Sequence, residues 1–364
     1  MRRHWQKKPL LVRQAWPGVV PPVTRSQLFA LAARDDVESR LVQRKRRGQW
    51  SLRHGPMPRR ALPSLQTPGW TLLVQGLDLH QQAAHEMLSR FRFVPEARLD
   101  DLMVSYATDG AGVGAHLDSY DVFLLQVQGR RRWSIGRVAR PEWVDGVPLK
   151  LLANFTPEQE WVLEPGDMLY LPPLWGHDGI AEGECMTCSV GFRAPAPAAL
   201  AHELLQHLAD EPDEGGARPL YRDRGQQAVD TPGRIPAELQ RFAEDAVRRV
   251  LCQPDAVDRA LGEVLTEPKP LVWFEPGEAM SGGGVRLDRR SRMMYDARHV
   301  FINGESFRAG GRDAQLMRRL ADQRALPAAA LGRLSDEARS LVDEWARAGW
   351  LRQDGDSPGD DEQE

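Results

Sequence analysis

The stretch at residues 112–133, GVGAHLDSYDVFLLQVQGRRRW, places a histidine and an aspartate two positions apart, directly before an apolar run and three arginines. Buried strands rarely begin with ionisable side chains unless a partner neutralises them. In a strand, residues i and i+2 point to the same face, so His116 and Asp118 would present an imidazole and a carboxylate side by side. A metal ion is one partner that suits both groups.

A second motif supplies a third ligand. Residues 164–179, EPGDMLYLPPLWGHDG, contain a turn, an apolar strand, two prolines and then a glycine-flanked histidine, His177. Two histidines and one carboxylate form the facial triad of non-haem iron(II) oxygenases, which leaves coordination positions open for a 2-oxo acid and dioxygen. A His-x-acid pair alone is expected about once by chance in this composition, so the prediction depends on both motifs together.

The arginines that follow the apolar run offer a site for the co-substrate. In a strand, Arg131 points opposite to Arg130 and Arg132, so it would face the interior while they face solvent. A guanidinium binds a carboxylate with two parallel hydrogen bonds, and Arg131 would hold the second carboxylate of a 2-oxo diacid. The alternative is an arginine-rich turn in solvent, which suits Arg130 and Arg132.

Composition limits the function classes. The 364 residues leave room for two or three domains. Three cysteines make no disulfide framework, and a net charge of −3 excludes a broadly basic surface. No apolar run approaches the roughly 18 residues of a membrane helix, and the first residues form no signal-type apolar segment. We therefore expect no membrane association and a cytoplasmic location.

The first half of the chain is predicted to be mostly β, with a few helices. Residues 1–195 contain short apolar runs separated by Gly, Pro and Asp, which is typical of a β-barrel or sandwich. Helical patterns interrupt them at residues 27–44 and 80–91. The Ala- and Pro-rich residues 194–199 mark a boundary, after which the apolar period becomes helical.

Three further segments follow this boundary. Residues 196–266 form a helical segment too small to bury its apolar faces alone, so we expect it to pack on the first domain or on a second copy of the chain. Residues 267–353 contain strands, two helices and a final strand, an order typical of a winged-helix-like module. Residues 354–364 carry six acids and no base, and are predicted to be a disordered, solvated tail.

The two motifs, together with SVGFRAP at residues 189–195 and DDLMVSYA at 100–107, resemble those of the bacterial JmjC-type ribosomal oxygenases, arginine hydroxylases of the sixteenth large-subunit ribosomal protein. The resemblance covers most of the chain. It implies a double-stranded β-helix (JmjC, cupin-like) catalytic domain, a helical segment that makes a homodimer, and a winged-helix domain at the C-terminus. The family's GGGVG loop is GAGVG here, and Ala115 stands where the family has proline.

The resemblance also assigns roles to individual residues. His116, Asp118 and His177 would bind Fe(II), while Arg131 and Ser105 would bind the distal carboxylate of 2-oxoglutarate. The implied reaction couples oxidative decarboxylation of 2-oxoglutarate by dioxygen to hydroxylation at C3 of an arginine side chain. Because that substrate is cationic, acids near the metal are expected to bind it. We take the candidates from the flanking loop and early strand: Asp109, Tyr120 and Asp121.

Two other readings compete with this one. In the first, a cupin-like barrel senses a ligand and the winged helix binds DNA as a regulator. The mild charge of residues 271–353 and the acidic tail make direct nucleic-acid binding unfavourable. In the second, the barrel is an oxygenase that acts on a small molecule or on another protein.

Overall fold

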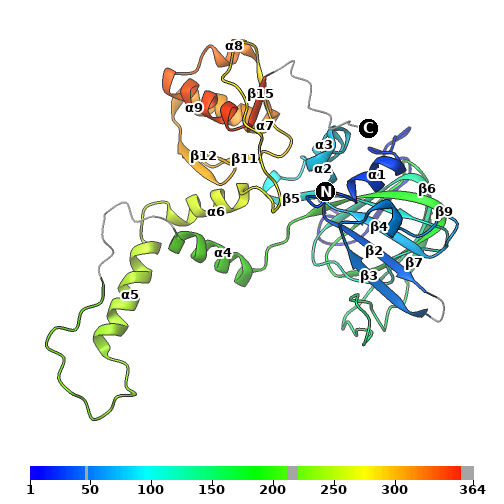
Figure 1. Ribbon diagram of the computed structural model, residues 1–364, viewed down its shortest axis with the longest axis horizontal. Helices are drawn as coiled ribbons and strands as arrows, with labels where there is room; N and C mark the ends of the chain where they lie inside the picture. The colour runs from blue at the N-terminus through cyan, green and yellow to red at the C-terminus, as the bar shows by residue number, and fades with distance from the viewer. Residues whose placement is uncertain (46–47, 211–219, 354–364) are drawn as a thin grey trace. The chain divides into compact units, whose positions relative to one another are not determined.

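The structure, a computed structural model, describes residues 1–45, 48–210 and 220–353. The described residues divide into two compact units, one built on Met1–Ala194 with Pro270–Trp273 and the other on Pro195–Lys269 with residues 274–353 (Figure 1). The first unit contains both motifs, so the predicted site belongs to it alone. The predicted acidic tail at 354–364 lies outside the described residues.

The first unit is a nine-stranded antiparallel sheet with strand order β1-β8-β6-β9-β5-β4-β2-β3, in which β7 also pairs with β6. Its longest strands, β6 and β9, pair along most of their length, from Val122 opposite Gly191 to Arg137 opposite Trp175. They carry the sequence motifs. The strands are β1 (Leu10–Val12), β2 (Ser39–Arg44), β3 (Trp50–His54), β4 (Trp70–Val74), β5 (Leu99–Ala107), β6 (Val122–Arg137), β7 (Gln159–Leu163), β8 (Met168–Leu171) and β9 (Trp175–Phe192).

The apolar run that opens β6 is buried on both faces. Phe123 and Leu125 belong to the larger core cluster, which the helices of this unit join. Val122 and Leu124 belong to a second cluster, on the other face, with Leu163 of β7. A strand covered on both sides reads as a continuous apolar run rather than an alternating one. This explains why all four residues of the run VFLL, residues 122–125, are apolar.

Three short helices accompany the sheet: α1 (Arg25–Leu31), α2 (Leu77–His80) and α3 (Gln82–Ser89), with 3-10 turns η2 (Arg59–Ala61) and η3 (Glu96–Arg98). The helix predicted at residues 80–91 is confirmed as α3. The helix predicted over residues 27–44 is wrong beyond its first part, because α1 ends at Leu31 and Ser39–Arg44 forms β2. Pairing of β2 with both β3 and β4 overrides the local helical pattern.

Among the described residues, the second unit combines six helices with two small sheets. One sheet has the order β14-β10-β15 and the other β11-β12-β13. Strands precede helices and a final strand, as predicted, but the short strand β14 and the short helix α8 also lie between α7 and α9. The elements are α4 (Pro197–Asp210), α5 (Ala237–Leu251), α6 (Ala256–Thr266), β10 (Val285–Leu287), β11 (Met293–Tyr295), β12 (His299–Ile302), β13 (Glu305–Arg308), α7 (Gly311–Gln323), β14 (Ala325–Leu326), α8 (Ala328–Leu331), α9 (Asp336–Arg347) and β15 (Leu351–Gln353).

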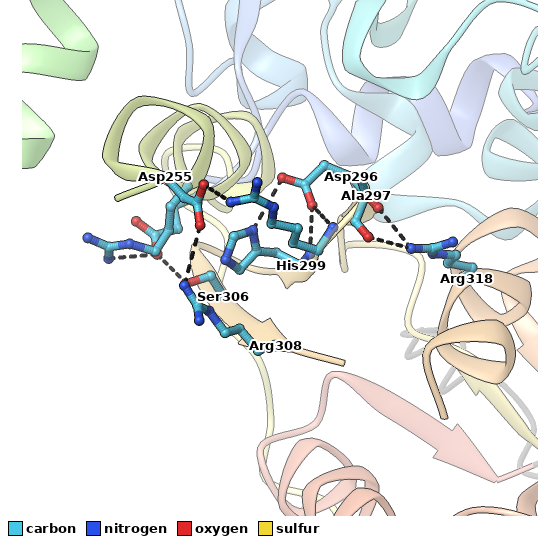
Figure 2. Close-up of polar contacts among 10 residues, drawn as sticks. Asp255, Asp296, Ala297, His299, Ser306, Arg308 and Arg318 are labelled. Carbon is cyan, nitrogen blue, oxygen red and sulfur yellow. Dashed lines mark hydrogen bonds and ion pairs between the residues drawn. The ribbon is translucent and has the colours of Figure 1, made fainter. Parts of the chain in front are cut away.

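Ion pairs join α6 to the strands of this unit, as Figure 2 shows. Asp255, just before α6, pairs with both Arg298 and Arg308. Arg318 donates to the carbonyl oxygen of Ala297 at 2.9 Å. Figure 2 also shows Asp296 beside His299. Much of the positive charge of this module is therefore used within the fold.

Asp288 is a second internal partner for arginines. Burial alone would raise the pKa of Asp288, but hydrogen bonds from Arg290 and Arg352 hold it at about 2. The carboxylate thus stays charged at neutral pH and ties β10 to β15. No helix in the described part of the chain is both long and apolar enough to cross a membrane.

Candidate metal centre and co-substrate cavity

His116 and His177 face each other through an isolated antiparallel bridge. Each backbone N–H donates to the other residue's carbonyl oxygen at 3.0 Å, and the ring centroids are 4.2 Å apart. The carboxylate of Asp118 reaches to 3.5 Å from Nε2 of His177. One ligand atom from each of the three side chains lies within 4.8 Å of the others, a spacing that suits a single metal ion. No other such group of three occurs among the described residues.

The backbone fixes which nitrogen of each histidine is available. Nδ1 of His116 lies 2.8 Å from the carbonyl oxygen of Gly114, and Nδ1 of His177 lies 2.9 Å from that of Trp175. A carbonyl only accepts, so each Nδ1 carries the proton and each Nε2 keeps its lone pair. Burial and the neighbouring His116 lower the pKa of His177 to about 4. The imidazole is therefore neutral near pH 7, as a metal ligand must be.

The three side chains line a cavity of about 350 Å³ inside the first unit. Arg131 also lines it and is only 4% exposed. Its Nη1 donates to Oγ of Ser105 at 2.8 Å, whereas Nε and Nη2 have no hydrogen-bond partner among the described residues. A buried guanidinium with two free donors is unfavourable unless an anion completes it. The cavity thus pairs a metal-type cluster with a carboxylate-type site.

A β-bulge gives Arg131 this orientation. The pairing of β6 with β9 shifts between Gln126 and Arg130, and Gly129 in the middle has a φ of 64°. A Cβ at Gly129 would lie 2.1 Å from the carbonyl oxygen of Glu184, so only glycine fits. Without the shift, Arg131 would point away from the face on which Leu124 lines the cavity. Arg131 therefore faces the cavity as predicted, but the β-bulge turns it there, and simple alternation along β6 would not.

The other predicted site residues are divided between the cavity and its surroundings. Tyr120 lines the cavity, and burial together with the charges of Asp118 and Asp101 raises the pKa of its phenol. Asp109 and Asp121 are not among the lining residues. Asp109 instead accepts from the backbone N–H of Gly183 at 2.7 Å.

Asp121 belongs to a separate buried network. Its carboxylate accepts from the phenol of Tyr170 at 2.6 Å and from the side chains of Gln6 and Arg98. The residue is fully buried among these partners. It therefore holds the N-terminal segment against the sheet and is not available to a ligand in the cavity.

Beside Asp118, the acids Asp100 and Asp101 line the cavity and were missed from the sequence; Asp101 is the buried one of these two. It lies on β5 at i−4 from Ser105, with Met103 between them, and all three line the cavity. Same-face alternation from Ser105 would have found it. One Oδ of Asp101 accepts from the backbone N–H of Gly76, and the other lies with Tyr120 beside Gly191.

Comparison with known proteins agrees with this geometry. The JmjC domain family matches residues 86–200, and the ROXA-like winged helix family matches residues 240–352. The ribosomal protein uL16 3-hydroxylase of Escherichia coli strain K12 is 32% identical over 86% of this chain and 86% of its own length.

Solved structures match over nearly the whole chain. The X-ray structure of E. coli YcfD superposes with a TM-score of 0.82 at 28% identity, covering 96% of each chain. A structure of the E. coli ribosomal oxygenase YcfD in complex with cobalt and 2-oxoglutarate superposes with a TM-score of 0.78 at 28% identity, covering 97% of each chain.

The metal cluster can be tested by binding alone. Replacing Asp118 with Asn removes the only anionic ligand, so we expect the affinity for Co(II) to fall by more than about a hundredfold. Isothermal titration calorimetry of the purified chain with Co(II) measures it. Asp109→Asn is the matched control, because this carboxylate lies outside the cavity. Equal Co(II) affinity in Asp118→Asn and wild type would contradict the assignment.

Proposed function

Because this chain belongs to the JmjC ribosomal oxygenase family, we propose that it hydroxylates C3 of an arginine side chain in ribosomal protein uL16, using Fe(II), 2-oxoglutarate and dioxygen. The chain is a 2-oxoglutarate-dependent oxygenase of this family. The observation that carries the proposal is the pairing, in one cavity, of the His-Asp-His cluster with the unsatisfied donors of Arg131. The first unit would then be the double-stranded β-helix of the catalytic domain.

Each residue of the cavity has a role in this reaction. His116, Asp118 and His177 would hold Fe(II) through two neutral imidazoles and one carboxylate, which leaves positions open for co-substrates. The bound iron would supply the activation of dioxygen against 2-oxoglutarate. Arg131 and Ser105 would bind the distal carboxylate of 2-oxoglutarate through charge-assisted hydrogen bonds. This orients the 2-oxo acid toward the metal.

The cationic substrate would enter past Asp101 and Tyr120. Asp101 offers a carboxylate to a guanidinium, and Tyr120 offers an aromatic face. Met103 lies between Asp101 and Ser105 along β5 and would contact the aliphatic part of the side chain. Of the three residues predicted to face the substrate, only Tyr120 keeps that proposed role.

The proposed helical dimer is supported by α5. This helix has no buried residue, and its apolar side chains include the exposed Leu239, Val247 and Leu251. Apolar residues at these spacings share one face, which a second copy of residues 196–266 would cover.

We expect Val247→Glu to convert a dimer into a monomer in sedimentation equilibrium. A monomeric wild-type chain would contradict the dimer.

The observed charges do not favour the DNA-binding alternative. Helix α9 has four acidic and two basic residues, and several arginines nearby pair internally (Figure 2). A helix with net negative charge would be repelled by phosphates. We therefore propose no direct nucleic-acid binding. A ribosomal substrate implies that the enzyme works in the cytoplasm.

The activity and the co-substrate site are tested together. Incubating the chain with Fe(II), 2-oxoglutarate and uL16 should add one oxygen atom to an arginine, detected by mass spectrometry. Arg131→Ala should raise the KM for 2-oxoglutarate about ten- to 150-fold, because it removes a charge-assisted hydrogen bond. Arg132→Ala is the control, since Arg132 pairs at the surface with Glu160 and Glu182. Absence of oxygen incorporation in uL16, with turnover on another target, would select the competing oxygenase reading.

The proposed contact between Asp101 and the substrate arginine is tested with uL16 as substrate. Asp101→Asn keeps the shape but removes the charge, so we expect the KM for uL16 to rise about ten- to 150-fold while 2-oxoglutarate binding changes little. Steady-state kinetics with each substrate varied in turn separates the two effects. Asp109→Asn should behave as wild type. An equal loss in both variants would show that the effect is general surface charge rather than a contact in the cavity.

A further inference from the structure

Leu174 has a backbone conformation that a side chain disfavours, and that side chain lies mostly in solvent. Its φ is 64°, in the left-handed region, and the residue is 62% exposed. For a residue with a Cβ this conformation is strained. Burial of the leucine does not offset the strain, because little of it is buried. Stability alone would therefore favour glycine at this position.

The backbone of Leu174 has a clear task that needs no side chain. Its N–H donates to the carbonyl oxygen of Asp118 at 2.8 Å, which holds the segment carrying that carboxylate. Pro172 and Pro173 precede it with fixed φ, and β9 begins directly after it at Trp175. A glycine would make the same hydrogen bond without strain. The leucine side chain thus remains unexplained by the fold.

A second element with exposed apolar side chains bonds to the other end of the segment from Ala115 to Asp118. Residues 142–153 form a hairpin in which Trp143 bridges to Leu152, and Leu152 N–H donates to the carbonyl oxygen of Ala115 at 2.8 Å. Trp143 and Val144 are exposed, while Lys150 and its neighbours line the cavity. The segment from Ala115 to Asp118 is therefore held at both ends by elements that present apolar side chains to solvent.

We propose that Leu174 is a docking contact for the polypeptide that carries the target arginine, against an apolar side chain close to that arginine in sequence, with Trp143 as a second contact. The inference rests on the proposed function. A cavity of about 350 Å³ admits a side chain but not the polypeptide around it, so the flanking residues must bind outside.

The attachment of both residues suits them to this role. Each belongs to an element hydrogen-bonded to the segment that carries His116 and Asp118. A polypeptide bound to them would be positioned relative to the metal cluster itself, and such positioning contributes to catalysis through orientation. Neither residue lines the cavity itself, but each is on an element bonded to the segment that does, and its exposed apolar side chain gains from burial on binding.

The strain provides a direct test. Leu174→Gly removes the side chain and the strain together, whereas Leu174→Ala removes most of the side chain and keeps the strain. We expect both variants to bind uL16 about tenfold more weakly, from the loss of apolar burial. Binding is measured by calorimetry with Co(II) in place of Fe(II), and thermal unfolding is measured in parallel. Leu174→Gly should unfold at the same temperature as wild type or higher, so that weaker binding does not reflect misfolding.

Turnover assays and a control variant distinguish a failure of the docking contact from a failure of the proposed function. In turnover assays the loss should appear in the KM for uL16 rather than in kcat. Val20→Ala, at an exposed apolar residue on neither of the elements bonded to residues 115–118, should bind as wild type. If wild type hydroxylates uL16 and both Leu174 variants bind it equally well, the docking contact is wrong and the function stands. If wild type neither binds nor hydroxylates uL16, both fall. A change of oligomeric state in Leu174→Gly would assign the contact to a second copy and overturn the proposal.

Discussion

The site depends on the backbone pairing of His116 with His177. The two residues are 61 positions apart in the chain, and their reciprocal hydrogen bonds of 3.0 Å place both imidazoles on one side of the sheet. His116 lies outside the longer strands. Its bridge to His177 is isolated, so no adjacent pair of backbone partners extends it. Hydrogen bonds to the carbonyl oxygens of Ala115 and Asp118 support the segment that carries it.

A second constraint links the metal cluster to the anion site. Gly129 permits the bulge in β6, and the bulge turns Arg131 onto the cavity face. Ser105 on β5 then meets the guanidinium across β9, since β9 pairs with both strands. The co-substrate site is thus assembled from three adjacent strands. Its geometry is set by strand pairing, whereas His116 and Asp118 lie in a segment outside the longer strands.

The grouping of the metal ligands could be predicted from the sequence, whereas the positions of the acids around them could not. The grouping of His116, Asp118 and His177 followed from two motifs with restricted chemistry. Asp109 and Asp121 were chosen because they are close in sequence to the ligands, but their side chains turn to Gly183 and to the N-terminal segment. The helix expected through residues 27–44 failed for a related reason. Residues 39–44 form a strand because they pair with β3 and β4, and such long-range pairing cannot be read from local periodicity.

The charges in the cavity are arranged in an order that suits two substrates of opposite sign. The buried cation of Arg131 contacts Ser105, whereas Asp101 and Tyr120 flank Gly191, and the charge of Asp118 acts on the phenol of Tyr120. A dianion such as 2-oxoglutarate is attracted to the guanidinium and repelled by the carboxylates, while a guanidinium substrate experiences the reverse. Each substrate bound in the other's place would meet a like charge, which costs several kcal/mol. The cavity therefore separates its two ligands by repulsion as well as by attraction.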